Sequence, residues 1–252
     1  MPIDFARELT GAERTQQGNR RLGLVLAFVA GALNAGGFLA VKQYTSHVTG
    51  TVSSVADQAV LNRWDLVVDG VVSVLAFMLG AMCCALMVNF ARRRALRSQY
   101  ALVLLAEAGL ILLFGLVGGQ LLHEETLFVP LTVLLLCFIM GLQNAVITKL
   151  SNAVIRTTHM TGIVTDLGIE LGRLAYINRH QMEGMQVVAD RTRLKVLAGQ
   201  LLTFLGGGIA GAYGFERFGY VSTVPLAVVL AAMALIPAMD DVQDWRGWGT
   251  RT

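Results

Sequence analysis

Residues 22–41 read LGLVLAFVAGALNAGGFLAV, a run of 20 residues without a charged side chain. A helix of about 20 mostly apolar residues is long enough to cross the hydrocarbon core of a bilayer. The run follows a hydrophilic lead and is longer than the apolar core of a signal peptide, so no cleavable signal is expected. This stretch therefore predicts a membrane-spanning helix.

Five more runs of this kind follow along the chain. The whole sequence is 55% hydrophobic and only 15% charged, whereas an ordinary soluble domain is about 25% charged. The runs are continuous and do not alternate at period two, which favours helices over a membrane barrel. We expect an all-α membrane protein with six spans, at residues 22–41, 66–90, 100–122, 126–148, 196–215 and 220–239.

Lys and Arg are divided unevenly between the expected loops. If the N-terminus is cytoplasmic and the six runs cross, 17 of the 20 basic residues lie on the cytoplasmic side. An excess of Lys and Arg marks cytoplasmic loops. We therefore expect a multi-pass protein of a bacterial inner membrane with both termini in the cytoplasm. Membrane lipid is then the expected surrounding partner, and the net charge of +3 gives no indication of nucleic acid.

Two patterns occur twice, in the same order. GALNA at residues 31–35 is matched by GLQNA at residues 141–145. TSHVTGTV at residues 45–52 is matched by TTHMTGIV at residues 157–164. Because both matches fall at the same place relative to the spans, they indicate an internal duplication.

The glycines of the later spans support this duplication. Phe77 and Gly80 in the second run recur as Phe204 and Gly207 in the fifth. The fifth run also reads GGGIAG at residues 206–211, and small residues let a neighbouring helix approach closely. We expect close helix packing there.

Each repeat contains three expected spans, and an odd number of crossings inverts the second repeat in the bilayer. Residues 45–61 and 157–177 are interpreted as re-entrant or interfacial helices, because a crossing at 45–61 would move the basic cluster at 92–97 outside. Secondary transporters use such inverted repeats, with the site near the midplane. The expected division is a cytoplasmic segment 1–21, a first repeat 22–125, a second repeat 126–239 and a cytoplasmic tail 240–252.

The pattern GALNAGGF at residues 31–38, followed by HVTG at residues 47–50, resembles the YoaK-like family of bacterial membrane proteins of unknown function. The resemblance covers most of the chain and implies a multi-span membrane protein without naming a chemistry. Two positions depart from the family pattern. Asn34 stands where many relatives have an acidic residue, and Thr51 follows Thr49-Gly50 where they tend to have Asn.

The repeated Thr-x-His-x-Thr-Gly runs are the first candidates for binding a solute. A half-helix beginning there would present free N–H groups and a partial positive charge, and His can exchange a proton near neutral pH. The alternative, with equal weight, is that both His only cap their helices, and that the Asn side chains only join neighbouring helices. The candidate solute-binding residues are Asn34, His47, Thr49, Gly50, Asn144, His159, Thr161 and Gly162.

Placing a carboxyl group inside an apolar membrane span costs free energy, so a carboxyl found there indicates a functional role. Glu107 lies deep in the third run and is the preferred candidate for proton or ion coupling. Asp69 lies near the outer end of the second run, and we expect it to reach water or to pair with Arg63.

Residues 157–177 have the pattern of an amphipathic helix, with Asp166 and Glu170 one turn apart on its polar side. These carboxyl groups are further candidates for proton or ion coupling. The alternative is a solvated face with Arg173 as the local counter-charge. The apolar side consists of Ile163, Leu167, Leu171 and Leu174.

No nucleotide-binding loop, zinc motif or nucleophile elbow occurs in the sequence. Cys83, Cys84 and Cys137 lie inside apolar runs without metal-ligand spacing. We expect no enzymatic activity, no metal and no cofactor. The sequence favours a permease for a small molecule or ion, with or without proton coupling. A passive six-span channel, a non-transporting membrane partner and an intramembrane enzyme are the alternatives, and the substrate and oligomeric state, including a homo-oligomer, stay open.

Overall fold

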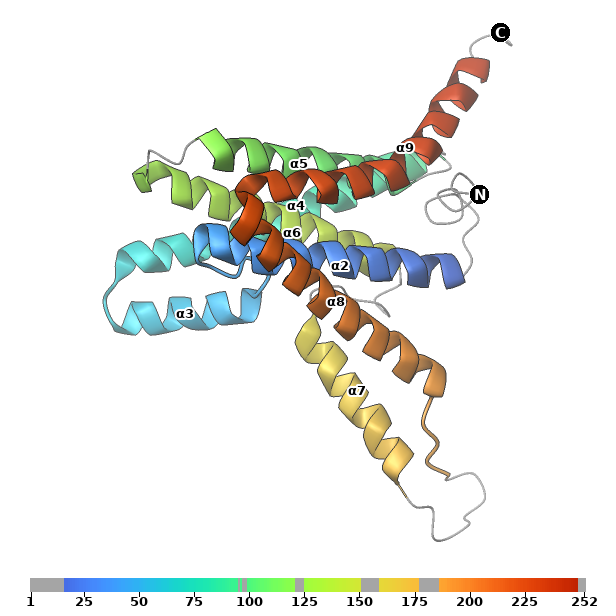
Figure 1. Cartoon of the computed structure of the whole chain (residues 1–252), viewed down its shortest axis with the longest axis horizontal. Helices are drawn as coiled ribbons and strands as arrows, with labels where there is room; N and C mark the ends of the chain where they lie inside the picture. Colours follow the sequence, from blue (N-terminus) through green and yellow to red (C-terminus); the bar gives the residue numbers. More distant parts are fainter. Residues whose placement is uncertain are drawn as a thin grey trace.

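The computed structural model describes residues 16–94, 96, 99–120, 125–150, 159–176 and 186–248. Within these residues the chain is almost entirely helical and contains no strand, so the expected all-α class is confirmed. The elements in chain order are α2 (Gln16–Val41), α3 (Val48–Val60), α4 (Trp64–Arg93), α5 (Ala101–Gln120), α6 (Glu125–Leu150), α7 (Met160–Ala175), α8 (Arg191–Phe218), the 3-10 turn η1 (Gly219–Ser222) and α9 (Thr223–Trp248) (Figure 1).

Five stretches of the described residues are long and apolar enough to cross a membrane. Four of them lie in α2, α4, α5 and α6, where the sequence places the first four runs. The fifth stretch, Arg191–Leu235, covers α8, η1 and half of α9, and the chain reverses direction at η1 (Figure 1). The two last expected runs therefore form one apolar stretch folded into two helices. The protein is a helical membrane-spanning protein.

Helices from the two halves of the chain are interleaved. α2 packs along α8, α4 packs along α6, and α5 packs along α9. Contacts advance together along α2 and α8, from Leu24 at Gly199 to Ala32 at Gly211, so this pair is parallel. Figure 1 shows that α4 and α6 also run in one direction, opposite to that of α2. Each half therefore buries its apolar surface against the other half.

A Phe-x-x-Gly pattern marks the crossing of α2 and α8. A Cβ at Gly31 would collide with the carbonyl oxygen of Phe204, and a Cβ at Gly207 would collide with the carbonyl oxygen of Phe28. The two backbones are therefore in direct contact, which only glycine permits. Close packing in the fifth run is thus confirmed at Gly207.

The crossing of α4 and α6 is built in the same way. A Cβ at Gly80 would collide with the carbonyl oxygen of Phe138, and a Cβ at Gly141 with the carbonyl oxygen of Phe77. The pattern occurs once on each of the four helices, and the two crossings are equivalent. The repeated pattern occupies residues 28–31, 77–80, 138–141 and 204–207.

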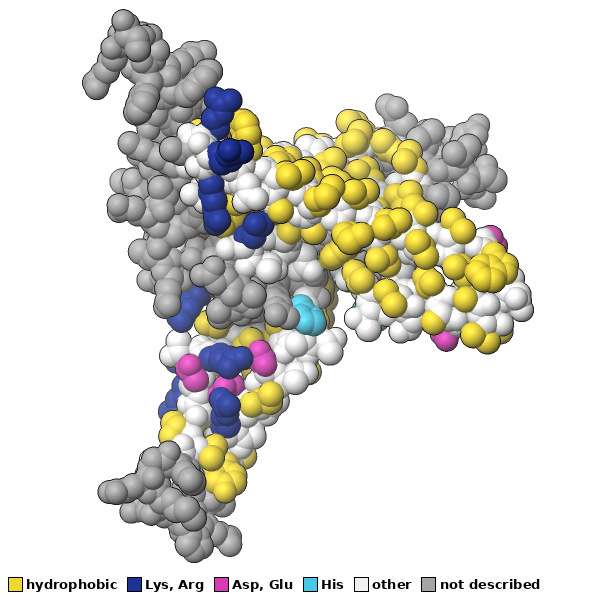
Figure 2. Space-filling view, turned by 180° about the vertical axis from the view of Figure 1, so that it is seen from behind, with side chains coloured by type: hydrophobic (Ala, Val, Ile, Leu, Met, Phe, Trp, Pro, Cys, Tyr) yellow, Lys and Arg dark blue, Asp and Glu magenta, His cyan; other side chains and the backbone are white. Residues whose placement is uncertain are grey.

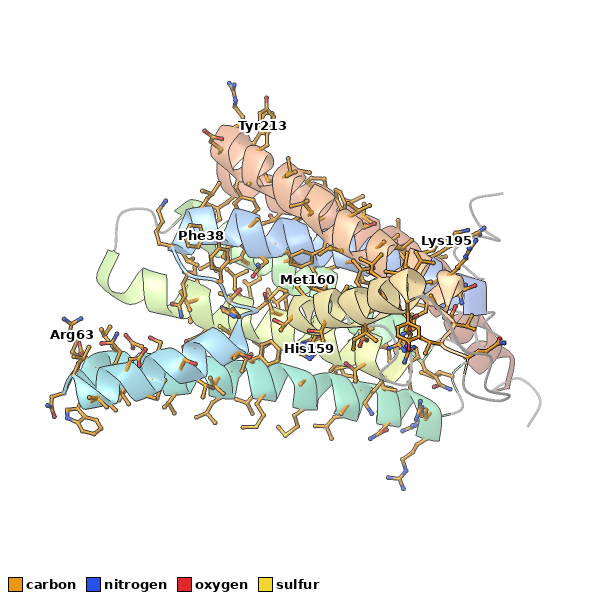
Figure 3. All side chains as sticks on the ribbon, turned by 90° about the horizontal axis from the view of Figure 1, so that it is seen from below. Phe38, Arg63, His159, Met160, Lys195 and Tyr213 are labelled. Carbon is orange, nitrogen blue, oxygen red and sulfur yellow. The ribbon has the colours of Figure 1, made fainter. Side chains whose placement is uncertain are left out.

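The two short helices extend away from these crossings. α3 has 13 residues and α7 has 16, fewer than the roughly 20 that a span requires. α3 packs on α4, and α7 packs on α8. Figures 1 and 3 show that both helices begin toward the middle of the molecule and run from there in opposite directions.

The surface separates apolar from basic regions. Figure 2 shows hydrophobic side chains over most of the visible bundle, whereas Lys and Arg gather where α4 ends. That end carries Arg92 and Arg93 in the last turn of α4. The arm formed by α7 and α8 differs, because charges of both signs lie on it (Figure 2).

Candidate functional site

Both short helices begin with a histidine. His47 is the N-cap residue of α3 and His159 is the N-cap residue of α7, and neither side chain hydrogen-bonds its helix. A Cβ at Gly50 would lie 2.5 Å from Nδ1 of His47, and a Cβ at Gly162 would lie 3.2 Å from Cδ2 of His159. The glycine three residues after each His therefore makes room for an imidazole folded over the first turn. Both histidines are exposed, so a partner from outside the chain can reach them.

A hydrogen bond joins the two repeated patterns of the first half. Ser46 Oγ donates to Asn34 Oδ1 over 2.7 Å, which holds the segment before α3 against α2. Asn144, the matching residue on α6, is half-buried, and its carbonyl oxygen accepts from Thr148 Oγ1 at 2.8 Å. Residues 157 and 158, which match Thr45 and Ser46, lie outside the described residues.

The threonines of the two patterns lie in the first turns of α3 and α7. Thr49 and Thr161 are exposed. Thr51 Oγ1 donates to the carbonyl of His47 at 3.2 Å, and Thr165 Oγ1 donates to the carbonyl of Thr161 at 2.8 Å. The side-chain hydroxyls of Thr49 and Thr161 take no part in these two helix-stabilising bonds.

A groove opens beside His47, between the end of α2 and the α3–α4 hairpin. Its volume is about 490 Å³. Gln58 Oε1 is buried there without a hydrogen-bond partner among the described residues. Asp69 also lines the groove. Of the two outcomes expected for it, the ion pair with Arg63 does not form, and the side chain instead lies exposed at the surface. The polar lining residues are Lys42, Gln43, Tyr44, His47, Thr51, Ser54, Gln58 and Asp69.

Glu107 on α5 and Gln143 on α6 are fully buried polar side chains. Both side chains are 0% exposed. Gln143 lies close enough to influence the Glu107 carboxyl, but no polar atom at the end of either side chain meets hydrogen-bond geometry with a described residue. A buried polar group without a partner is costly, which marks this pair as functional or as strained.

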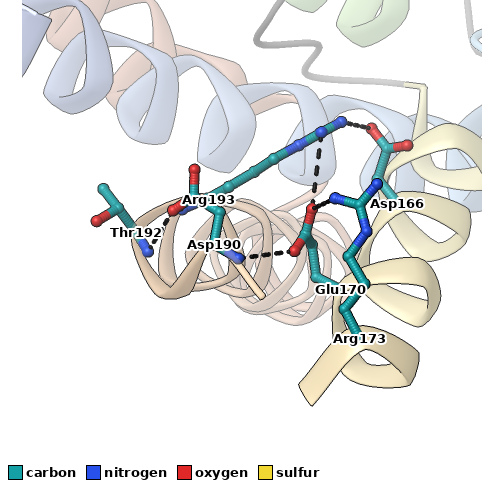
Figure 4. Close-up of polar contacts among 6 residues, drawn as sticks. All are labelled: Asp166, Glu170, Arg173, Asp190, Thr192 and Arg193. Carbon is teal, nitrogen blue, oxygen red and sulfur yellow. Dashed lines mark hydrogen bonds and ion pairs between the residues drawn. The ribbon is translucent and has the colours of Figure 1, made fainter. Parts of the chain in front are cut away.

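The acidic pair of α7 faces α8. Glu170 is 1% exposed and accepts from Arg173 Nη1 and from the backbone N–H of Asp190, each at 2.9 Å (Figure 4). Asp166 Oδ2 accepts from Arg193 Nη2 at 2.9 Å. Arg173 is thus a counter-charge of Glu170, but a solvated face was the wrong expectation for Glu170, because α8 covers it.

The apolar side of α7 also differs from expectation. Ile163 is buried and Leu167 is half-buried, whereas Leu171 and Leu174 are exposed. Only the first turns of α7 therefore use the apolar side for packing. The second half of the helix is held to α8 through its charges.

Ser46, Gln58 and Arg193 were not among the residues predicted for the site. Arg193 lies 27 residues from Asp166, and nothing in the sequence measures that separation in space. Gln58 had a signal, since it matches Glu170 when the two His-x-x-Gly patterns are aligned. No group of three or more His, Cys, Asp or Glu that could hold a metal occurs among the described residues.

Comparison with known proteins identifies the family. No curated protein and no solved structure matches the chain. One family model matches residues 22–236, which include every candidate residue. The match agrees with the resemblance to the YoaK-like family. The chain belongs to the family described as "Protein of unknown function (DUF1275)".

Proposed function

We propose that the protein is a permease for a small solute, with its site between the two halves near the bilayer midplane. In this proposal α2, α4, α5, α6, α8 and α9 cross the inner membrane as a 3+3 inverted repeat, and α3 and α7 are re-entrant. Both termini are cytoplasmic. The lipid bilayer and the solute are the partners, and the protein has no enzymatic activity.

The helix directions support this arrangement. Six alternating crossings make α2 parallel to α8, make α4 parallel to α6 and oppose α5 to α9, which is the observed packing. α2 begins and α9 ends at the same end of the bundle (Figure 1). The excess of Lys and Arg then assigns that end to the cytoplasm.

One observation carries the proposal: α3 and α7 begin toward the middle of the bundle and run in opposite directions, each with a histidine at its N-cap (Figure 3). Half-helices that begin at the midplane and approach it from opposite faces are a recurrent plan of secondary transporters. The residues that line the proposed pathway are Asn34, His47, Thr49, Gly50, Asn144, His159, Thr161 and Gly162.

The buried Glu107 favours proton coupling over a passive channel of the same architecture. A channel for a neutral solute has no use for a buried carboxyl that lacks a hydrogen-bond partner among the described residues, and such groups mark proton relays in membrane proteins. Uptake by reconstituted vesicles with and without a pH gradient separates the two functions. Uptake that needs the gradient supports a coupled permease, and gradient-independent flux supports the channel.

The proposal is tested by flux together with topology. Vesicles with the double variant His47→Ala/His159→Ala should lose solute uptake, while Arg63→Gln at the α3–α4 tip should retain it. On a cysteine-free background, His47→Cys and His159→Cys should react with membrane-impermeant reagents added from opposite sides. Labelling of both from the same side, or vesicles without any solute flux, would overturn the permease.

A further inference from the structure

The groove beside α3 carries unpaired charges of both signs. Lys42 and Asp69 both line it, and neither forms an ion pair with a described residue. An ammonium and a carboxylate that share one cavity but do not pair with each other leave two separated charges for a ligand to complement.

The two charges are positioned by different elements. Lys42 directly follows α2 with a positive φ of 58°, and its backbone N–H donates to the carbonyl of Phe38 at 2.7 Å. Asp69 lies in the second turn of α4. Lys42 follows the end of α2 and Asp69 lies near the start of α4. Because these are two different helices, their packing sets the separation of the two charges.

Acceptor groups line the same groove as the two charges. Gln58 Oε1 is buried and has no partner among the described residues. Thr51 Oγ1 already donates to the carbonyl of His47, so its remaining capacity is to accept. Together with Asp69, these oxygens bring three hydrogen-bond acceptors to one groove, and the N–H groups of a ligand's ammonium would satisfy them.

In the second half, α7 and α8 form the corresponding pair of helices, and there the polar groups pair with each other. Counted from the two histidines, Ser54 and Gln58 of α3 match Asp166 and Glu170 of α7. In α7 both matching carboxylates are engaged, and Arg193 of α8 lies 2.9 Å from Asp166 and 3.7 Å from Glu170. Among the described residues Gln58 Oε1 has no such partner, so this groove can accept a donor from an external ligand.

We propose that this groove binds a small zwitterion of the amino-acid class. The ligand's ammonium group lies against Asp69, Gln58 and Thr51, and its carboxylate lies against Lys42. A cavity of about 490 Å³ is within the usual range for small-molecule sites, roughly 300–1,000 Å³. The assignment rests on the proposed permease only for the step after binding, in which the solute passes His47.

The test uses the full chain in lipid nanodiscs and three probes that separate the charges. Alanine carries both charges, ethylamine carries only the cation, and propionate carries only the anion. Isothermal titration should detect binding of alanine and much weaker binding of the other two. Equal affinity for all three, or binding of none, would overturn the assignment.

Charge variants locate the binding. Asp69→Asn and Lys42→Gln should each weaken alanine binding about tenfold or more, because each removes a charged hydrogen-bonding partner. Asp65→Asn, one turn earlier on α4 and outside the groove, is the matched control and should bind as the parent does. Unchanged affinity in both groove variants would place the alanine elsewhere.

These experiments distinguish a failure of the proposed binding site from a failure of the proposed transport function. If the nanodiscs bind alanine but vesicles pass no solute, the permease is overturned and the groove assignment stands. If vesicles transport a solute while none of the three probes binds, the permease stands and the zwitterion site is overturned.

Discussion

The carbonyl oxygen of Phe204 on α8 occupies the place where a side chain at Gly31 of α2 would begin. Phe28 and Gly207 repeat this relationship one turn away, so a backbone carbonyl of each helix contacts the glycine of the other helix. The matched crossing of α4 and α6 uses Phe77, Gly80, Phe138 and Gly141. Two equivalent contacts of this kind define the centre of the fold and do not accommodate even one methyl group.

The first prediction therefore concerns Gly207. Gly207→Ala should lower the free energy of unfolding by about 1–3 kcal/mol or more, because the new Cβ meets backbone and no flexible side chain. The neighbouring Gly206 faces open space, and Gly206→Ala should be neutral or stabilise by up to about 1 kcal/mol. Thermal unfolding in detergent compares the two variants, and equal melting temperatures would contradict the packing at this crossing.

A second prediction concerns Glu170, which is buried, and Asp166, whose side chain is 42% exposed. Glu170→Gln should cost about 1.5–3 kcal/mol, because it weakens hydrogen bonds to a buried charge. Asp166→Asn weakens only a solvated ion pair and should cost about 1 kcal/mol or less. Chemical unfolding of both variants gives the ranking, and a larger loss for Asp166→Asn would mean that α8 does not cover Glu170.

A third prediction concerns pH. Asp190 caps α8 by accepting from the backbone N–H groups of Arg193 at 3.0 Å and Thr192 at 2.9 Å. These hydrogen bonds, with that from Arg193 acting most strongly, hold the pKa of the Asp190 carboxyl below its ordinary value. A carboxyl whose pKa is lower in the folded protein adds stability above its unfolded pKa, about 3.9, and this stability is lost as the pH falls through the folded pKa.

Asp190→Asn keeps an oxygen at the cap but removes the charge. The parent should therefore melt at a higher temperature than the variant at pH 7, and the difference should shrink once the pH falls below about 4. Melting curves of both proteins across this range make the comparison. A difference that is the same at every pH would show that the charge of Asp190 plays no part.

Much of the fold follows from the sequence because apolar run length and repeated patterns are local signals. The runs predicted α2, α4, α5 and α6, and the His-containing repeats predicted where α3 and α7 begin. The interleaving of the halves was not predicted, because a duplicated pattern gives similarity and not contact. Phe-x-x-Gly occurs on all four helices, with Phe28 and Phe138 three residues before the glycines of the GxxNA patterns. It marks where a helix can be approached closely but does not identify the partner helix.

The candidate site was predictable only in part. The sequence places His47 and Asn34 in one half, but it does not show that Ser46 joins the two patterns through the Asn34 side chain. Asp69 was expected to reach water or to pair with Arg63, which is close to it in sequence. The structure has Asp69 facing the groove while Arg63 lies at the far tip of the α3–α4 hairpin (Figure 3). The direction in which a side chain points near the start of a helix depends on the conformation of the preceding loop, and amino-acid composition does not determine that conformation.

The last prediction separates coupling from stability at Glu107. Because its carboxyl oxygens have no partner among the described residues, Glu107→Leu replaces an unsatisfied buried group with an apolar one of similar size. Stability should be unchanged or higher, by up to about 4 kcal/mol. Gln200→Leu is the matched control, since Gln200 on α8 is 1% exposed and its amide is also without a partner among the described residues. Its stability should change in the same direction.

The two variants, Glu107→Leu and Gln200→Leu, should differ in transport. Glu107→Leu should abolish uptake driven by a pH gradient yet preserve exchange of solute between the two sides of the vesicle, because exchange needs no net proton movement. Gln200→Leu should retain both activities. If Glu107→Leu unfolds the protein, Glu107 has a structural partner. If gradient-driven uptake survives in a stable Glu107→Leu protein, the proton is carried elsewhere, and the exposed imidazoles of His47 and His159 become the groups to substitute next, because imidazole groups serve as proton shuttles in proteins.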